Sequence, residues 1–86
     1  MKEEIVDLIA YIKLSPYRKD LLRFLSENIR IPSEIAKVLD TSPPNVSRLL
    51  KGLEEKELIV CLTPNKKIGR LYKATELGNE VLNYFK

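Results

Sequence analysis

Residues Thr41 to Leu53, TSPPNVSRLLKGL, place two consecutive prolines directly before a run with the apolar spacing of a helix. Ser42 is a residue type preferred at a helix N-cap, and proline is tolerated just after it because the first helical amides have no intrahelical acceptor. We therefore predict a helix from Pro43 to about Lys56. The apolar residues recur at steps of three and four and should form its buried face: Val46, Leu49, Leu50 and Leu53.

Comparable signals extend in both directions from this helix. Upstream, apolar spacing and Ser15-Pro16 predict three further helices, at Lys2 to Lys13, Pro16 to about Glu27, and Pro32 to about Leu39. Residues 28–31 read as a short extended piece. Downstream, two β-prone segments, Leu58 to Thr63 and Arg70 to Ala74, flank a turn, and Thr75 caps a final helix that runs to residue 86. The expected class is α+β, mainly α, in a single domain that spans residues 1–86.

Positive charge is concentrated in two short segments. Residues 43–51 hold two basic residues and residues 64–73 hold four, and neither segment contains an acidic residue. The whole chain carries +3, so the remainder carries −3. An uneven distribution of this kind favours an anionic partner, most often nucleic acid.

Composition argues against an enzyme and against a metal site. The chain has no histidine, so the commonest general base is missing, and its single cysteine leaves no plausible ligand set for zinc. Its three glycines are isolated and form no phosphate-binding loop. We expect no cofactor and no metal.

The order of short helix, tight turn, capped helix and basic hairpin resembles a winged helix-turn-helix domain. PSEIAKVLDTSPPNVSRLL resembles the helix-turn-helix itself, with Ala36 where the two helices must cross closely. VSRLLKGLEEKELI and GRLYKATELGNEVL resemble the recognition helix, wing and closing helix of MarR- and ArsR-like regulators from bacteria and archaea. The resemblance implies a three-helix core and a two-stranded β-wing with extra terminal helices, in which the helix-turn-helix covers about residues 32–56 and the wing about 58–74.

Two positions depart from the pattern of these families. Asp40 stands where many such turns have glycine, although aspartate tolerates the left-handed conformation better than most residues. Glu57 stands where glycine usually follows the recognition helix. The cysteines and histidines of metal-sensing ArsR proteins are absent, so metal sensing is not implied.

The resemblance implies a sequence-specific regulator of transcription that binds double-stranded DNA, with one helix in the major groove. Asn45 is suited to adenine, and Arg48 to guanine or a phosphate. The remaining expected contacts on the recognition helix are Thr41, Ser42, Pro44, Ser47 and Lys51. The expected contacts of the wing, on the backbone or in the minor groove, are Lys66, Lys67 and Arg70.

Other readings remain open at this point. A winged domain can also serve as a protein-interaction module, with its basic segments on an acidic partner, or as a nonspecific chromosomal DNA-binding protein; RNA binding is a weaker option. Arg48 and Lys51 alone could be ordinary solvated charges on an amphipathic helix.

The terminal helices carry apolar stripes that suggest pairing of two chains. Related domains commonly form homodimers through such helices, and pairing would set two recognition helices about 34 Å apart. The expected interface residues are Ile5, Leu8, Ile9, Ile12, Val81, Leu82 and Phe85. Alternatively, they complete the core of one chain. The N-terminus lacks the pattern of a signal peptide and the apolar runs are short, so we expect no membrane association and a cytoplasmic location.

Overall fold

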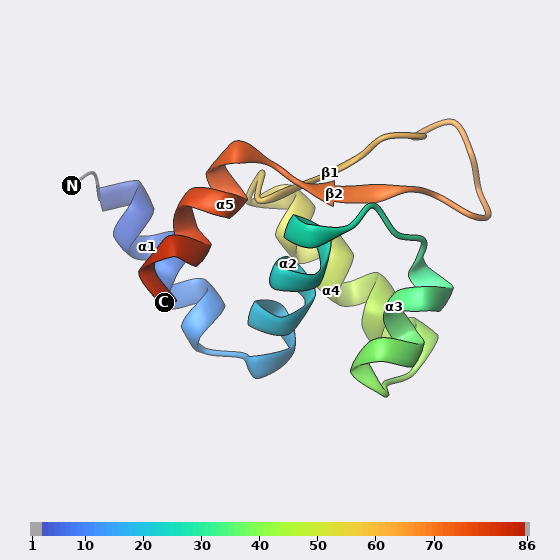
Figure 1. Cartoon of the computed structure of the whole chain (residues 1–86), viewed down its shortest axis with the longest axis horizontal. Coiled ribbons are helices and arrows are strands. Elements are labelled where there is room, and N and C mark those ends of the chain that lie inside the picture. Colours follow the sequence, from blue (N-terminus) through green and yellow to red (C-terminus); the bar gives the residue numbers. More distant parts are fainter. Residues whose placement is uncertain (1–2, 86) are drawn as a thin grey trace.

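The computed structural model of the protein describes residues 3–85, with side chains from Ile5 onward. Within these residues it contains five α-helices, one short 3-10 helix and a two-stranded antiparallel sheet (Figure 1). The elements are α1 (Glu3–Lys13), α2 (Pro16–Glu27), α3 (Pro32–Leu39), α4 (Pro43–Glu55), β1 (Ile59–Cys61), β2 (Tyr72–Ala74), α5 (Glu76–Leu82) and η1 (Asn83–Phe85). This arrangement confirms the predicted α+β winged helix-turn-helix. The expected helix ends at Lys2 and Lys86 lie outside the described residues.

Three helices begin at the side-chain caps that the sequence suggests. Ser15 Oγ accepts a hydrogen bond from Arg18 N at 3.4 Å, and Ser42 Oγ accepts one from Asn45 N at 3.4 Å. Thr75 Oγ1 accepts from Gly78 N at 3.0 Å. Each cap satisfies an amide that has no partner within the helix and typically contributes about 1 kcal/mol. In α2 and α4 a proline follows the cap at once, because its missing donor costs nothing there.

Helix α2 lies at the centre of the fold and packs against the other four helices and β2. Its Leu21 and Leu22 are fully buried. Helix α4 adds Val46, Leu50 and Leu53 to the same core, while Leu49 is half-buried beside it. The predicted buried face of α4 is therefore confirmed, and the opposite face of the helix is left in solvent.

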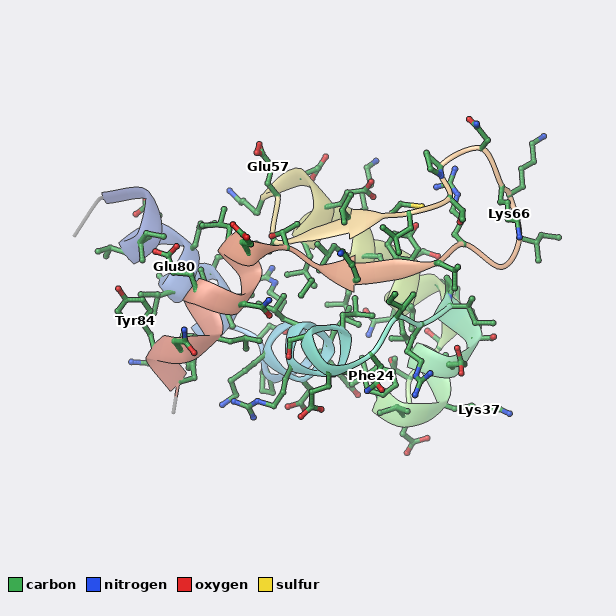
Figure 2. All side chains as sticks on the ribbon, turned by 45° about the horizontal axis from the view of Figure 1, so that its top comes forward. Phe24, Lys37, Glu57, Lys66, Glu80 and Tyr84 are labelled. Atoms are coloured by element: carbon green, nitrogen blue, oxygen red, sulfur yellow. The ribbon has the colours of Figure 1, made fainter. Side chains whose placement is uncertain are left out.

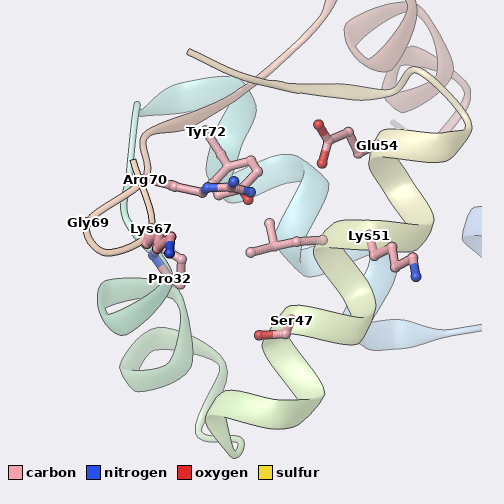
Figure 3. A pocket seen from close by; sticks show the side chains of 9 residues that line it. Pro32, Ser47, Lys51, Glu54, Lys67, Gly69, Arg70 and Tyr72 are labelled. Atoms are coloured by element: carbon pink, nitrogen blue, oxygen red, sulfur yellow. The ribbon is translucent and has the colours of Figure 1, made fainter. Parts of the chain in front are cut away.

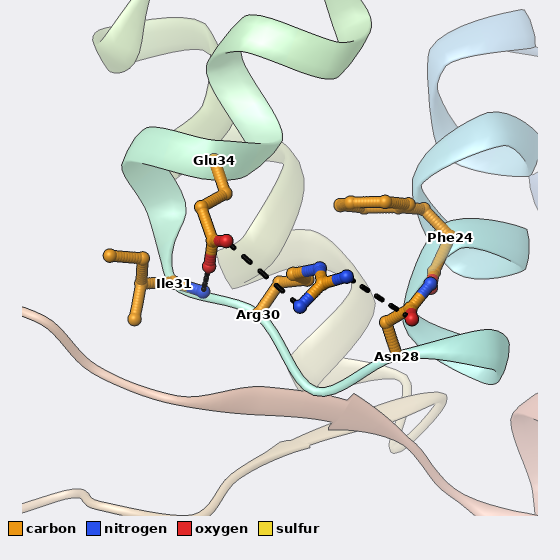
Figure 4. Close-up of polar contacts among 5 residues, drawn as sticks. All are labelled: Phe24, Asn28, Arg30, Ile31 and Glu34. Carbon is orange, nitrogen blue, oxygen red and sulfur yellow. Dashed lines mark hydrogen bonds and ion pairs between the residues drawn. The ribbon is translucent and has the colours of Figure 1, made fainter.

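The connection between α2 and α3 joins the sheet as a one-residue third strand. Arg30 N donates to Tyr72 O at 3.1 Å, and Tyr72 N donates to Arg30 O at 2.9 Å. The Arg30 side chain connects this segment to both helices (Figure 4). Its Nη2 donates a hydrogen bond to Asn28 Oδ1 at 3.2 Å, and its guanidinium lies over the Phe24 ring of α2. Its Nη1 lies 4.0 Å from Glu34 Oε2 of α3. The expected extended piece at residues 28–31 is confirmed, and it fixes α3 relative to the wing.

Both strands are shorter than predicted. β1 covers Ile59–Cys61 and not Leu58 to Thr63, and β2 begins at Tyr72 and not at Arg70. Leu71 N donates to Thr63 Oγ1 at 3.0 Å instead of to a carbonyl of the facing strand, and the Arg70 side chain bonds back to the loop. The two strands are therefore paired at only three positions within the described residues: Ile59 with Ala74, Val60 with Lys73, and Cys61 with Tyr72. We call residues 59–74 the wing and residues 64–69 the wing tip.

Asp40 and Glu57 both adopt the left-handed conformation, with φ of 52° and 61°. After α3, Thr41 N donates to Ala36 O at 3.1 Å; after α4, Leu58 N donates to Leu53 O at 3.0 Å. These bonds are typical of helices that end in a left-handed residue. The chain thus enters the wing through an ordinary helix terminus, although a glutamate stands where glycine would be free of strain.

The wing tip and the terminal helices lie at opposite ends of the molecule. Figure 1 shows α1, α5 and both chain ends on one side, with α3 and the wing tip on the other. Among the described residues, no helix is long and apolar enough to cross a membrane.

Candidate nucleic-acid interface

The solvent face of α4 carries the polar residues that the sequence singles out. Pro44, Ser47, Arg48 and Lys51 are all exposed. Among the described side chains, the one ion pair within 4.0 Å joins Arg30 and Glu34, so no described carboxylate lies that close to Arg48 or Lys51. These two cations are therefore available to an external anion.

The start of α4 is pre-arranged by hydrogen bonds among three of the expected contact residues. Asn45 Nδ2 donates a hydrogen bond to Thr41 Oγ1 at 2.9 Å, and Ser42 Oγ accepts a hydrogen bond from the backbone N–H of Asn45. Asn45 and Thr41 are half-buried as a result. The Asn45 amide retains one N–H and its oxygen for another partner, and the Ser42 hydroxyl can still donate its proton. This geometry leaves Asn45 able to pair with a base edge in a fixed orientation.

Arg70 holds the wing tip together. Its Nε donates to Lys66 O at 2.6 Å, and its Nη2 donates to Pro64 O at 3.0 Å. The neighbouring Tyr72 side chain raises the pKa of the Arg70 guanidinium, which is charged at physiological pH in any case. Arg70 was expected as a free cation of the wing, but much of its donor capacity is used inside the chain. Lys66 and Lys67 are exposed and are the free cations of this segment.

An open groove of about 450 Å³ separates α4 from the wing (Figure 3). Ser47, Lys51 and Glu54 line its α4 side, and Lys67, Gly69 and Arg70 line its wing side. Lys67 and Arg70 make the wing side of the groove basic, whereas the Lys51 side chain points away from the groove, along the solvent face of α4 (Figure 3). Glu54 is an exposed carboxylate in the same groove, which the sequence reading did not connect with the interface because it lies outside the two basic segments.

Gly52 in the middle of α4 was left unexplained by the sequence. A Cβ at this position would collide with the hydroxyl of Tyr11, which crosses from α1. The absence of a side chain at Gly52 therefore leaves room for the end of the Tyr11 side chain. Because the partner lies on another element far along the chain, no spacing within α4 could have indicated it.

The apolar stripes of the terminal helices serve mainly the core of one chain. Ile12 and Val81 are 0% exposed, and Ile5 and Leu82 are also buried. Leu8, Ile9 and Phe85 are half-buried and pack against the core. For these first four residues the structure favours the alternative, that they complete the core of one chain, because they leave little or no surface for a partner to contact. Val6, Leu14 and Tyr84 are the exposed apolar residues of these segments.

Comparison with known proteins places these features in a family. A family model of the MarR family matches residues 12–65. The chain belongs to the MarR family. The MarR match includes α2, α3 and α4 and ends before Lys66, so the wing cations fall outside it. No curated protein matched the chain.

Solved structures agree with the MarR assignment. ZitR of Lactococcus lactis in complex with DNA is 32% identical, with a TM-score of 0.71 over 78% of this chain and 47% of that chain. A C30AH42A mutant of ZitR is 30% identical, with a TM-score of 0.73 over 83% of this chain and 49% of that chain. MepR of S. aureus in a DNA complex shares the fold, at 23% identity and a TM-score of 0.76 over 96% and 71% of the two chains. This MarR-family chain therefore spans about half the length of the ZitR structures.

Proposed function

We propose that the chain is a transcriptional regulator that binds double-stranded DNA in a sequence-specific manner. In this proposal α4 enters the major groove, and the wing lies on the neighbouring backbone or in the minor groove. The observation that carries the proposal is the solvent face of α4, with exposed Arg48 and Lys51, next to a groove whose wing side carries Lys67 and Arg70. Membership of the MarR family and the similarity to ZitR in complex with DNA support it.

Helix α4 and the wing suit a DNA duplex both in their size and in the chemistry of their side chains. Helix α4 has 13 residues and is about 20 Å long, and a major groove about 12 Å wide admits one such helix. Asn45 and Arg48 are proposed to read bases, since amide and guanidinium groups form paired hydrogen bonds with adenine and guanine. Thr41, Ser42, Pro44, Ser47 and Lys51 are proposed to contact the backbone or the groove wall, and Lys66, Lys67 and the remaining donors of Arg70 the phosphates beside the wing.

We also propose that the protein acts as a homodimer. Exposed apolar side chains persist on the terminal segments, with Leu14 80% and Val6 52% exposed. Half-buried Leu8, Ile9 and Phe85 belong to the same terminal segments, and the terminal helices lie opposite the wing tip. Pairing there would leave both recognition helices free to face one duplex. Sedimentation of a monomer at micromolar concentration would rule the dimer out.

Selection of bound sequences from a random duplex pool tests the proposed function. The expected result is an enriched motif made of two related half-sites, about one duplex turn apart from centre to centre. Binding without enrichment would identify a nonspecific DNA-binding protein. The absence of any binding at low salt, by protein shown to be folded, would remove the DNA proposal and leave a protein-interaction module.

A further inference from the structure

The wing tip presents a large apolar side chain to solvent. Ile68 is 90% exposed, more than any other large hydrophobic residue described. Its side chain buries almost no surface within the chain, so it contributes little hydrophobic stabilisation to the fold. A single exposed apolar residue is common on protein surfaces, so its meaning depends on how it is held and on its surroundings.

The loop that carries Ile68 is tied in place by several hydrogen bonds. Arg70 bonds to the carbonyls of Pro64 and Lys66, and Lys66 N donates to Thr63 O at 3.1 Å. Gly69 follows with a φ of 70°, which reverses the chain directly after Ile68. The tip is thereby held away from the body of the protein, as the extended loop near Lys66 shows (Figure 2). Ile68 is therefore displayed by an organised loop.

The surroundings of Ile68 are cationic. Lys66 and Lys67 precede it and Arg70 follows, and residues 64–73 contain no carboxylate side chain. One apolar group among cations matches a surface with anionic rims and apolar walls. The minor groove of DNA is such a surface, because phosphates line its edges and sugar C–H groups line its walls. Proteins that enter this groove use apolar side chains, isoleucine among them, together with arginine and lysine.

We propose that Ile68 is the apolar contact of the wing with the walls of the minor groove, next to the major-groove segment that α4 occupies. The inference rests on the proposed DNA binding and adds Ile68 to its contact residues, with the minor groove and not the backbone as the place where this side chain binds. The occupant is DNA because the tip is continuous with the basic groove beside α4. An anionic lipid surface is the other chemistry that attracts an apolar residue among cations, but one isoleucine supplies little of the apolar area that membrane binding requires.

The test compares Ile68→Ser with Ile29→Ser in duplex binding over a range of salt concentrations. Ile29 provides the same substitution at a residue that is 49% exposed on the α2–α3 connection. Ile68→Ser should weaken binding to the selected duplex about fivefold, as expected for loss of a half-buried isoleucine contact. The slope of log K against log salt should stay unchanged, because an apolar contact releases no counterions. Ile29→Ser should bind as the wild type does.

Two further measurements separate this contact from other roles. Lys67→Ala should reduce the salt slope by about one unit, the opposite signature to Ile68→Ser. In hydroxyl-radical footprinting, the minor groove next to the wing should lose its protection with Ile68→Ser and keep it with Ile29→Ser. Wild-type affinity for Ile68→Ser, or a loss that changes the salt slope, overturns the inference while leaving the proposed function standing. Loss of binding to vesicles rich in phosphatidylserine, with duplex binding intact, assigns the tip to a membrane and also overturns it. Failure of the wild type to bind any duplex would instead reject the proposed function itself.

Discussion

The hydroxyl of Tyr11 on α1 lies against Gly52 in the middle of α4, at a point where any side chain would collide with it. The Tyr11 ring is held there by two cations, with Arg18 Cζ 3.9 Å and Lys56 Nζ 5.4 Å from its centroid. Arg18 Nη1 also donates to Tyr11 O at 2.8 Å. The Tyr11 side chain thus connects the N-terminal helix to the helix that we propose to read DNA.

A double-mutant cycle tests this contact. In the wild-type background Gly52→Ala should not stabilise the protein, because the added methyl group displaces Tyr11 and offsets the gain of about 1 kcal/mol in helix propensity. In a Tyr11→Phe background the colliding oxygen is gone, so Gly52→Ala should stabilise by about 0.5–1 kcal/mol. Urea unfolding measures the coupling. Additive effects of the two substitutions would show that the helices do not meet at this point.

Replacement of Glu57 by glycine should stabilise the protein. Glu57 has a φ of 61° and is exposed. A non-glycine residue in this conformation costs about 1–2 kcal/mol. Glycine removes this cost but loses more conformational entropy on folding, which offsets part of the gain. The expected net gain is about 0.5–1 kcal/mol, which raises the melting temperature by several degrees. Glu55→Gly, at the last residue of α4, is the matched control and should destabilise instead. An unchanged or lower melting temperature for Glu57→Gly would mean that the glutamate makes compensating contacts.

Local signals in the sequence predict most of the fold. Ser15, Ser42 and Thr75 predict their helix starts because capping depends on residues within one turn. The bend at Asp40 is predicted for a similar reason, since its side chain tolerates left-handed geometry. The seat of Tyr11 on Gly52 is not predictable in this way, because it depends on how two separate helices cross. The predicted start of β2 at Arg70 is also wrong, because the Arg70 side chain bonds to the loop and the residue does not extend the strand.

Arg70→Lys should loosen the wing tip while keeping its charge. A lysine ammonium lacks the planar fork with which Arg70 reaches the carbonyls of Pro64 and Lys66 together. Backbone ¹⁵N relaxation should show lower order parameters for residues 65–69 than in the wild type. Lys73→Arg, an exchange on the outer face of β2, should leave them unchanged. Order parameters at wild-type values in Arg70→Lys would show that the guanidinium does not hold the tip.

Glu54→Gln should strengthen DNA binding. The Glu54 carboxylate lies in the groove beside Arg70 and Lys51, where it should repel a phosphate. We expect a gain of about two- to threefold at low salt that shrinks as salt screens the charge. Glu80→Gln removes an exposed carboxylate from α5, far from the wing tip, and serves as the control. Weaker binding of Glu54→Gln would place the DNA elsewhere on the protein.

The candidate site illustrates a second limit of sequence reading. Charge counts direct attention to residues 43–51 and 64–73, because the distribution of charge is visible in the chain itself. They do not reveal which cations already have partners, and the Arg70 guanidinium donates two hydrogen bonds within the wing. They also do not separate apolar residues that close one core, such as Ile12 and Val81, from those that remain exposed for a partner.

The salt dependence of duplex binding tests the central claim most directly. If Lys51, Lys66, Lys67 and Arg70 each neutralise a phosphate, log K should fall with log salt with a slope of about −3 to −4 per chain. The double variant Lys66→Ala, Lys67→Ala should lower the steepness by about two units while remaining folded. A folded protein that binds no duplex at low salt, or that binds with a slope near zero, would contradict the account.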